Sequence, residues 1–249
     1  MIAPNAAYHT IKKGHGGQVK TIGLIGGMSW ESTVPYYRTL NQVIKEQLGG
    51  LHSARVVLYS VDFHEIEVLQ RSGDWDGAGA ILASAARSLE AAGAEFIVLC
   101  TNTMHKVASA IEGAVSLPML HIADPTAEVI KAAGQRTVGL LGTRFTMEQP
   151  FYRERLEREH GLHVLTPEED DRAIVHRIIY KELCLGEVKA ESRVQYQRIL
   201  SGLKARGAEA VILGCTEISL LVRPEDTDVP LVDTTAVHAR AAALFALKD

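Results

Sequence analysis

Short apolar segments without polar alternation recur along the chain and predict buried β-strands. Such runs, rich in β-branched residues, are typical of strands that are covered on both faces of a parallel sheet. The segments lie at 21–26, 55–61, 95–99, 117–120, 137–141, 162–165, 209–213 and 229–232. Between them lie longer Ala-, Leu-, Arg- and Glu-rich segments with a helical pattern, for example 76–92 and 188–206. This alternation of strands and helices predicts an α/β fold.

The two halves of the chain repeat one another. GAEFIVLCTNT at 93–103 aligns without a gap with GAEAVILGCTE at 207–217, so that Thr101 falls on Cys215. Two more pairs keep the same order: TIGLIGGMS with TVGLLGTRF, and LPMLHIADPTAEVI with VPLVDTTAVHARAA. Any α/β protein reuses apolar strands and small-residue turns, but three matched segments in one order favour a true repeat.

The repeat predicts two pseudo-symmetric lobes, each a mostly parallel sheet flanked by helices. We expect residues 1–19 to be a flexible extension, residues 20–134 the first lobe and residues 135–249 the second. The helix that ends each lobe could pack on the other lobe. Ligands bind outside the carboxyl ends of the strands in such sheets, and the repeated polar clusters lie there. We therefore expect the active site in a cleft between the lobes.

Cys215 is the first candidate for chemistry. It follows a buried strand, with Gly214 before it and polar residues after it. A helical pattern then begins, and a helix N-terminus stabilises a thiolate and lowers the pKa of a cysteine. The alternative is a small buried side chain, which is the usual role of a free cysteine. Cys184 has no repeat partner, and we interpret it as a packing residue.

Thr101 occupies the equivalent position in the first half. Successive side chains of a strand point to opposite faces, so Thr101 is expected to face the site and Cys100 the interior. A threonine hydroxyl can relay a proton if a neighbour activates it, or it can only bind the substrate. Asn102 and Thr103 add hydrogen-bonding groups at the next helix start, where an anion is favoured. For Thr103, a plain N-cap is the alternative.

Two turns complete the list of candidate binding residues. GGMSWES at 26–32 and its partner GTRFT at 142–146 can present backbone N–H groups to a carboxylate, which singles out Met28, Ser29, Thr143 and Arg144. Arg144 could instead form a surface ion pair. His52, in a loop before a strand, could reach the site or only cap it.

Composition narrows the class of protein. The formal net charge of −4 and the interspersed charges give no footprint for nucleic acid. No apolar stretch is long enough to span a membrane, and the N-terminus lacks the apolar core of a signal peptide. Three cysteines without an export signal favour free thiols in a reducing cytoplasm. No histidine pair has metal-ligand spacing with a cysteine or a carboxylate, so we expect no metal.

Five motifs resemble the aspartate/glutamate racemase family: IGGMSWEST, GGLHSA, CTNTMH, LLGTRFTMEQ and GCTEI. The resemblance runs from about Lys20 to the C-terminus and is closest to bacterial L-aspartate/glutamate-specific or broad-specificity amino-acid racemases. It implies two Rossmann-like lobes, homodimers and racemisation of an amino acid without a cofactor by two opposed cysteines. The family's first reactive triplet is Cys-Asn-Thr, whereas this chain has Thr101-Asn102-Thr103.

The resemblance therefore places Cys215 opposite Thr101 as the acid and base on the two faces of the α-carbon. Asn102, Thr103 and Thr216 would hold the α-carboxylate of the substrate, which takes up the charge of the carbanion. Glu217 is a further candidate binding residue in the intact second motif. Two alternatives remain open. One is a cysteine-dependent decarboxylase or isomerase of the same superfamily that acts on a small dicarboxylate. The other is a non-catalytic small-molecule binding protein.

Overall fold

The structure is a computed structural model that describes residues 19–248. The predicted extension at residues 1–19 lies outside the described residues, apart from Val19. The described chain divides into two compact units. We call residues 19–121 with 238–248 the first lobe and residues 122–237 the second lobe.

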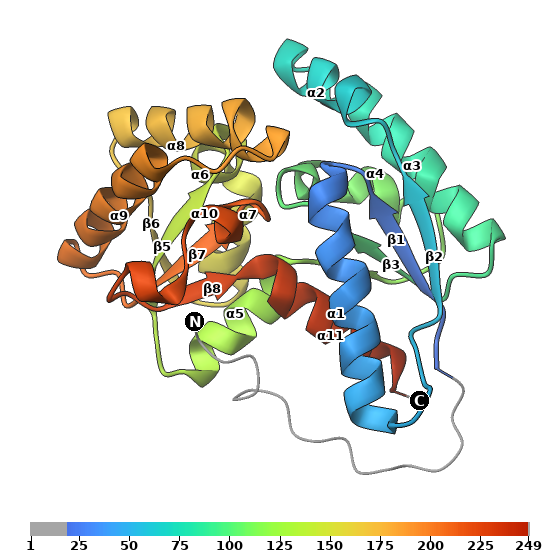
Figure 1. Ribbon diagram of the computed structural model, residues 1–249. Coiled ribbons are helices and arrows are strands. Elements are labelled where there is room, and N and C mark those ends of the chain that lie inside the picture. The colour runs from blue at the N-terminus through green and yellow to red at the C-terminus, as the bar shows by residue number, and fades with distance from the viewer. Residues whose placement is uncertain (1–18, 249) are drawn as a thin grey trace. The chain divides into compact units, whose positions relative to one another are not determined.

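Each lobe contains one four-stranded parallel sheet (Figure 1). The first sheet has the order β2-β1-β3-β4, and its strands are β1 (Ile22–Gly26), β2 (Val56–Ser60), β3 (Phe96–Leu99) and β4 (Met119–Leu120). The second has the order β6-β5-β7-β8, and its strands are β5 (Thr137–Gly142), β6 (His163–Leu165), β7 (Ala210–Gly214) and β8 (Leu231–Asp233). The predicted α/β fold with two parallel sheets is confirmed, and the two strand orders are identical when each strand is matched to its repeat.

The sheets also agree in register. Ile25 of β1 pairs with Leu99 of β3, and the aligned residues Leu141 of β5 and Leu213 of β7 form the same pair in the second sheet. In each lobe the chain therefore leaves the two central strands at the same edge of the sheet. The repeated polar clusters follow directly.

Helices flank both sheets. Those of the first lobe are α1 (Trp30–Leu48), α2 (Phe63–Ser72), α3 (Trp75–Ala91), the 3-10 turn η1 (Thr103–Val107) and α4 (Ala108–Glu112). Those of the second lobe are α5 (Ala123–Ala132), α6 (Arg144–Glu148), α7 (Pro150–Glu154), the π-helical turn η2 (Arg155–Glu159), α8 (Glu169–Lys181), η3 (Leu183–Leu185), α9 (Ala190–Ala205), α10 (Ile218–Leu221) and η4 (Pro224–Asp226). The last helix, α11 (Thr234–Ala246), begins in the second lobe and ends in the first.

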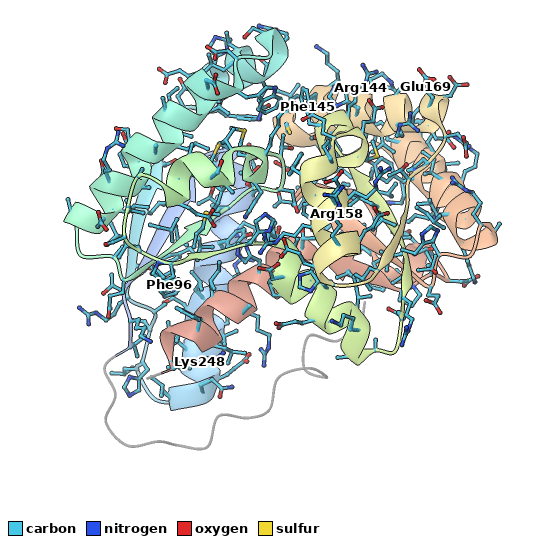
Figure 2. The ribbon with its side chains drawn as sticks, turned by 180° about the vertical axis from the view of Figure 1, so that it is seen from behind. Phe96, Arg144, Phe145, Arg158, Glu169 and Lys248 are labelled. Atoms are coloured by element: carbon cyan, nitrogen blue, oxygen red, sulfur yellow. The ribbon has the colours of Figure 1, made fainter. Side chains whose placement is uncertain are left out.

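The central strands of the first sheet are covered on both faces, whereas the edge strand β2, predicted to be buried, is largely exposed. Ile25, Ile97 and Leu99 share a buried cluster with Leu82 of α3. Strand side chains alternate in direction, so Phe96 points to the opposite face. Figure 2 labels Phe96, whose ring packs edge-on against Phe245 of α11 with the ring centroids 4.8 Å apart. Two covered faces explain why β1 and β3 read as continuous apolar runs.

The second sheet follows the same rule. Leu141 and Leu213 pack in one cluster with residues of α8 and α9. Leu140 and Ile212, whose side chains alternate with these, pack in a second cluster with Ile130 of α5. The helix α5 therefore packs on the second sheet, which is the arrangement that the sequence left open for the helix ending residues 20–134. The division falls at 121/122 because the apolar face of α5 contacts β5 and β7.

Among the described residues, no helix is long and apolar enough to cross a bilayer.

Candidate active site

Cys215 is the first residue after β7, at the carboxyl edge of the second sheet. The thiol lies in a buried position, with the residue 8% exposed. Gly214 and Gly142 pair across β7 and β5, and a Cβ on Gly142 would come within 2.9 Å of the Gly214 carbonyl oxygen. The close approach of two backbones at this point accounts for a glycine on each strand.

A buried carboxylate collects hydrogen bonds beside Cys215. The Cys215 thiol donates to Oε2 of Glu217 at 3.0 Å, and the Thr216 hydroxyl donates to the same oxygen at 2.5 Å. The Cys184 thiol of η3 lies 3.8 Å from the other oxygen, Oε1. Glu217 itself is 3% exposed. The structure thus brings together Cys215, Thr216 and Glu217, and it adds Cys184, which the sequence assigned only to packing.

The pKa of the Cys215 thiol shifts in the direction opposite to the expectation. Burial, followed by the neighbouring Glu217 carboxylate, holds the pKa of the Cys215 thiol well above its usual value. The predicted lowering by a helix dipole is wrong, because the helix that follows, α10, has four residues and begins only at Ile218. A helix this short carries little aligned dipole, and an adjacent carboxylate opposes a thiolate.

Thr143 and Arg144 begin α6 directly after β5, beside β7 in the sheet. Thr143 is buried and caps the helix: its hydroxyl oxygen accepts from the Thr146 backbone N–H at 3.3 Å. Arg144 is exposed, and its guanidinium lies 3.9 Å from Glu148 one turn later, which corresponds to the surface ion pair of the alternative interpretation. Figure 2 labels Arg144 beside Phe145, whose ring faces His176 of α8 with the centroids 6.2 Å apart.

Thr101 occupies the matching place in the first lobe, just beyond β3. It is 8% exposed, as Cys215 is. Cys100 is completely buried, its thiol directed at the Val98 carbonyl at 3.9 Å, and burial raises the pKa of this thiol. Cys100 therefore has the environment of a packed side chain.

Asn102 and Thr103 follow in a buried turn. Thr103 is the first residue of η1 and Asn102 precedes it, so the N-cap position belongs to Asn102. The plain N-cap interpretation of Thr103 is therefore corrected by one residue. Boundaries at this scale depend on how the chain leaves the strand, which the sequence pattern does not resolve.

The glycine-rich turn after β1 lies next to the end of β3. Gly27 has φ of +94°, and its N–H donates to the Thr33 hydroxyl oxygen at 2.9 Å. Met28 and Ser29 follow and are buried. The Ser32 hydroxyl lies 2.7 Å from the Ser29 carbonyl oxygen and 3.4 Å from that of Cys100, so one side chain links the turn to the end of β3.

His52 does not join this group. It is exposed, in the turn before β2. All four strands are parallel, so their amino ends share one edge and their carboxyl ends the other. The loop that carries His52 enters the sheet at the amino edge, whereas Thr101 leaves it at the carboxyl edge.

A cluster of buried histidines lies behind Thr101 in the first lobe. Nδ1 of His105 lies 2.7 Å from the Thr101 carbonyl oxygen, and its ring packs against His121 with the centroids 4.4 Å apart. His238 lies 2.9 Å from the Leu120 carbonyl through Nε2 and 2.8 Å from the Tyr36 hydroxyl through Nδ1. A carbonyl only accepts, so Nε2 of His238 carries the proton and Nδ1 accepts from tyrosine. Residue spacing gave no signal for this grouping.

Asp124, Glu159 and His160 form a cluster of metal-ligand types within the described part of the second lobe. Arg155 already donates to both Asp124 oxygens, at 2.7 and 2.9 Å, and His160 lies 2.9 Å from one of them. Although burial opposes it, these hydrogen bonds lower the pKa of Asp124. A carboxylate bonded in this way has its lone pairs engaged, so we assign the cluster to holding α5 against η2.

The protein is a two-lobed α/β protein with one parallel sheet in each lobe. In each sheet the second central strand is followed closely by a buried thiol or hydroxyl, so the same kind of site occurs twice. The chain matches the Asp/Glu/Hydantoin racemase family over residues 25–242 and belongs to that family. This confirms the resemblance inferred from the motifs.

Individual relatives agree with the family. The broad specificity amino-acid racemase RacX of Bacillus subtilis (strain 168) is 25% identical over 227 residues, which cover 88% of this chain and 95% of RacX. The crystal structure of an Asp/Glu racemase candidate from Yersinia pestis is 61% identical with a TM-score of 0.86, covering 92% of this chain and all (100%) of that one. PH1733, an aspartate racemase homologue from Pyrococcus horikoshii OT3, is 37% identical with a TM-score of 0.78 and the same coverage, 92% and 100%.

Proposed function

We propose that this chain is an amino-acid racemase of the aspartate/glutamate type. Cys215 moves the α-proton on one face of the substrate, and Thr101 serves the other face. The observation that carries the proposal is the equivalence of the two residues: Thr101 and Cys215 each lie two residues beyond the matched leucines Leu99 and Leu213, at the end of the second central strand, in sheets of identical order and register. The family and the named relatives support the same reaction class.

Racemisation requires a base and an acid on opposite faces of one carbon. When the Cα–H bond breaks, its electron pair passes into the α-carboxylate, and hydrogen-bond donors stabilise the charge that develops there. Asn102 and Thr103 supply such donors, together with the backbone N–H groups at Met28 and Ser29. The Thr216 hydroxyl, expected to join them, donates its one proton to Glu217 instead. A pyridoxal group and a metal are not needed in this scheme.

The two reactive residues differ in strength. A thiol exchanges protons far more readily than an aliphatic hydroxyl, so the two directions of turnover are expected to have unequal kcat values. The equilibrium constant between enantiomers is still one, so the difference in kcat must be balanced by a difference in KM.

Proton NMR in deuterium oxide with a panel of L- and D-amino acids tests the proposal. We expect the α-proton signal of aspartate, glutamate or a related amino acid to disappear while the opposite enantiomer forms. Loss of carbon dioxide from a dicarboxylate, with no exchange in any amino acid, would instead support the decarboxylase alternative. Binding without either reaction would support the binding protein. Protection of Cys215 from alkylation by aspartate or glutamate provides an independent check.

A further inference from the structure

His176 lies on α8 beside the buried cluster that contains Cys215. Val175, the residue before it, is a member of that cluster, and Tyr180 packs against the cluster from its edge. The ring of His176 lies between two aromatic rings, with centroids 4.8 Å from Tyr180 and 6.2 Å from Phe145. His176 is only partly buried. Its ring is therefore held in place by packing while a dissolved molecule can still reach it.

The start of α6 connects His176 to the strand ends of the second sheet. The backbone N–H of Arg144 donates to Nδ1 of His176 at 3.2 Å. Arg144 lies two residues after Gly142, and Gly142 pairs with Gly214, the residue before Cys215. The strand end next to the thiol thus leads directly to the contact that holds the imidazole.

The contact with Arg144 also fixes which nitrogen of His176 carries the proton. A backbone N–H only donates, so Nδ1 accepts through its lone pair, and the proton of the neutral ring is on Nε2. Burial, followed by the Arg144 guanidinium, lowers the pKa of His176, although Glu148 opposes this shift. The ring is therefore neutral near neutral pH, and Nε2–H is a hydrogen-bond donor whose direction is set by the packing of the ring.

Positive charge lies around this donor. Oε1 of Glu148 accepts from the Arg172 guanidinium at 2.9 Å and lies 3.9 Å from that of Arg144, so two guanidinium groups share one carboxylate. Arg172 lies four residues before His176 on α8, a spacing that places two side chains on one face of a helix. An oriented N–H donor next to guanidinium groups is suited to bind a carboxylate.

We infer that His176 is a specificity-determining residue, whose Nε2–H donates to the side-chain carboxylate of an acidic amino acid bound at Cys215. The inference rests on the proposed function, since it extends the same site from the reacting carbon to the far end of the substrate. Arg144, a candidate binding residue from the sequence, supplies positive charge beside this donor. His176 gave no such signal in the sequence, because it meets Arg144 across 32 intervening positions.

Binding measured without net turnover tests this inference. Isothermal titration calorimetry with racemic glutamate, aspartate and alanine gives the preference, defined as the dissociation constant of alanine divided by that of the tighter-binding acidic amino acid. His176→Asn keeps an oxygen near the position of Nδ1 for the Arg144 N–H but has no donor at the position of Nε2. We expect the preference to fall at least ~tenfold, the size of a lost hydrogen bond to a charged group. If His176 only anchors α6, the preference is unchanged.

His163→Asn is the matched control. His163 is exposed and is the first residue of β6, so it lies at the amino edge of the second sheet, whereas Cys215 lies at the carboxyl edge. The control should keep the wild-type preference. A folded His176→Asn that keeps the preference, or an equal loss in His163→Asn, would overturn the inference. So would a wild type that binds alanine as tightly as the acidic amino acids, or that binds none of the three.

Long-range proton–nitrogen NMR of the wild type provides a readout that needs no variant. We expect His176 to be protonated on Nε2 at neutral pH, and its Nε2 resonance to move when glutamate or aspartate is added but not when alanine is added. An unmoved resonance, or an equal movement with alanine, overturns the inference even if His176→Asn does not fold.

The exchange of the α-proton separates this inference from the proposed function. If the preference and the Nε2 resonance behave as expected but no amino acid exchanges its α-proton, the proposed function fails and the binding role of His176 stands. If amino acids are exchanged while His176→Asn keeps the wild-type preference, the racemase stands and the role of His176 fails.

Discussion

The ends of β3 and β7 share one backbone plan and carry different chemistry. In both lobes the strand ends beside the other central strand, and the next residues turn into a short helix. Behind Thr101 lies a group of histidines, with His105 bonded to its carbonyl at 2.7 Å. Beside Cys215 lies a carboxylate that accepts from the thiol at 3.0 Å. The repeat thus places a thiol or a hydroxyl at equivalent strand ends, and the residues around it differ between the two lobes.

Cys215→Ser gives the largest expected effect on this comparison, because it makes both strand ends hydroxyls. A serine hydroxyl ionises far above a thiol, so α-proton exchange should fall by about 10²–10⁴-fold, the contribution of a well-placed acid or base. Proton NMR in deuterium oxide measures it. Cys100→Ala, which removes the packed thiol of the first lobe, should retain exchange. Comparable exchange by folded Cys215→Ser would show that another group is the base.

Gly27→Ala tests the difference between the two turns after β1 and β5. Gly27 aligns with Thr143, but its φ is +94° and a Cβ would lie 2.2 Å from the Val61 carbonyl oxygen. We expect a loss of at least about 2 kcal/mol in the free energy of unfolding, because backbone strain and a clash with main-chain atoms add together. Urea denaturation followed by circular dichroism measures this loss.

Gly49→Ala is the matched control for Gly27→Ala. Gly49 also has a positive φ, +76°, but nothing lies within 4 Å of a Cβ built there. Only backbone strain is added, so the cost should be about 1 kcal/mol. Equal costs for the two variants would show that the turn after β1 shifts to accept a side chain, contrary to the geometry described here.

All eight strands could be predicted from the sequence, because each is a short apolar run that ends near small or polar residues. Burial on both faces explains the pattern of the central strands only, since the edge strand β2 is exposed at Leu58 and Tyr59. The repeat also predicted the equivalent positions of Thr101 and Cys215. Two other features could not be predicted. The length of α10 depends on packing after Leu221, and the approach of Cys184 to Glu217 joins residues far apart in sequence. For α5 the sequence left open which lobe it packs on, because that depends on which sheet its apolar face contacts.

Thr101→Cys makes the two strand ends chemically alike, and its expected effect is smaller. In the wild type, kcat should differ between the L-to-D and D-to-L directions if, as we propose, a thiol serves one face and a hydroxyl the other. The variant should keep activity, raise the slower kcat by up to about tenfold, and bring the ratio of the two kcat values toward one. Circular dichroism of the amino acid during turnover measures both directions. Equal kcat values in the wild type, or a folded variant without activity, would contradict the pairing.

Thr143→Ala gives the smallest expected effect and bears on the second lobe alone. The Thr143 hydroxyl oxygen accepts from the Thr146 N–H at 3.3 Å at the start of α6, and loss of such a cap costs about 1 kcal/mol. The change should appear as a lower midpoint in urea denaturation. Thr143→Ser keeps the oxygen and loses only the methyl group, so it should retain most of the stability. If Thr143→Ser lowers the stability as much as Thr143→Ala does, the methyl contacts stabilise this turn more than the cap does. The turn of the second lobe would then be held by packing, whereas the turn of the first lobe is held by the hydrogen bond from the Gly27 N–H to the Thr33 hydroxyl oxygen.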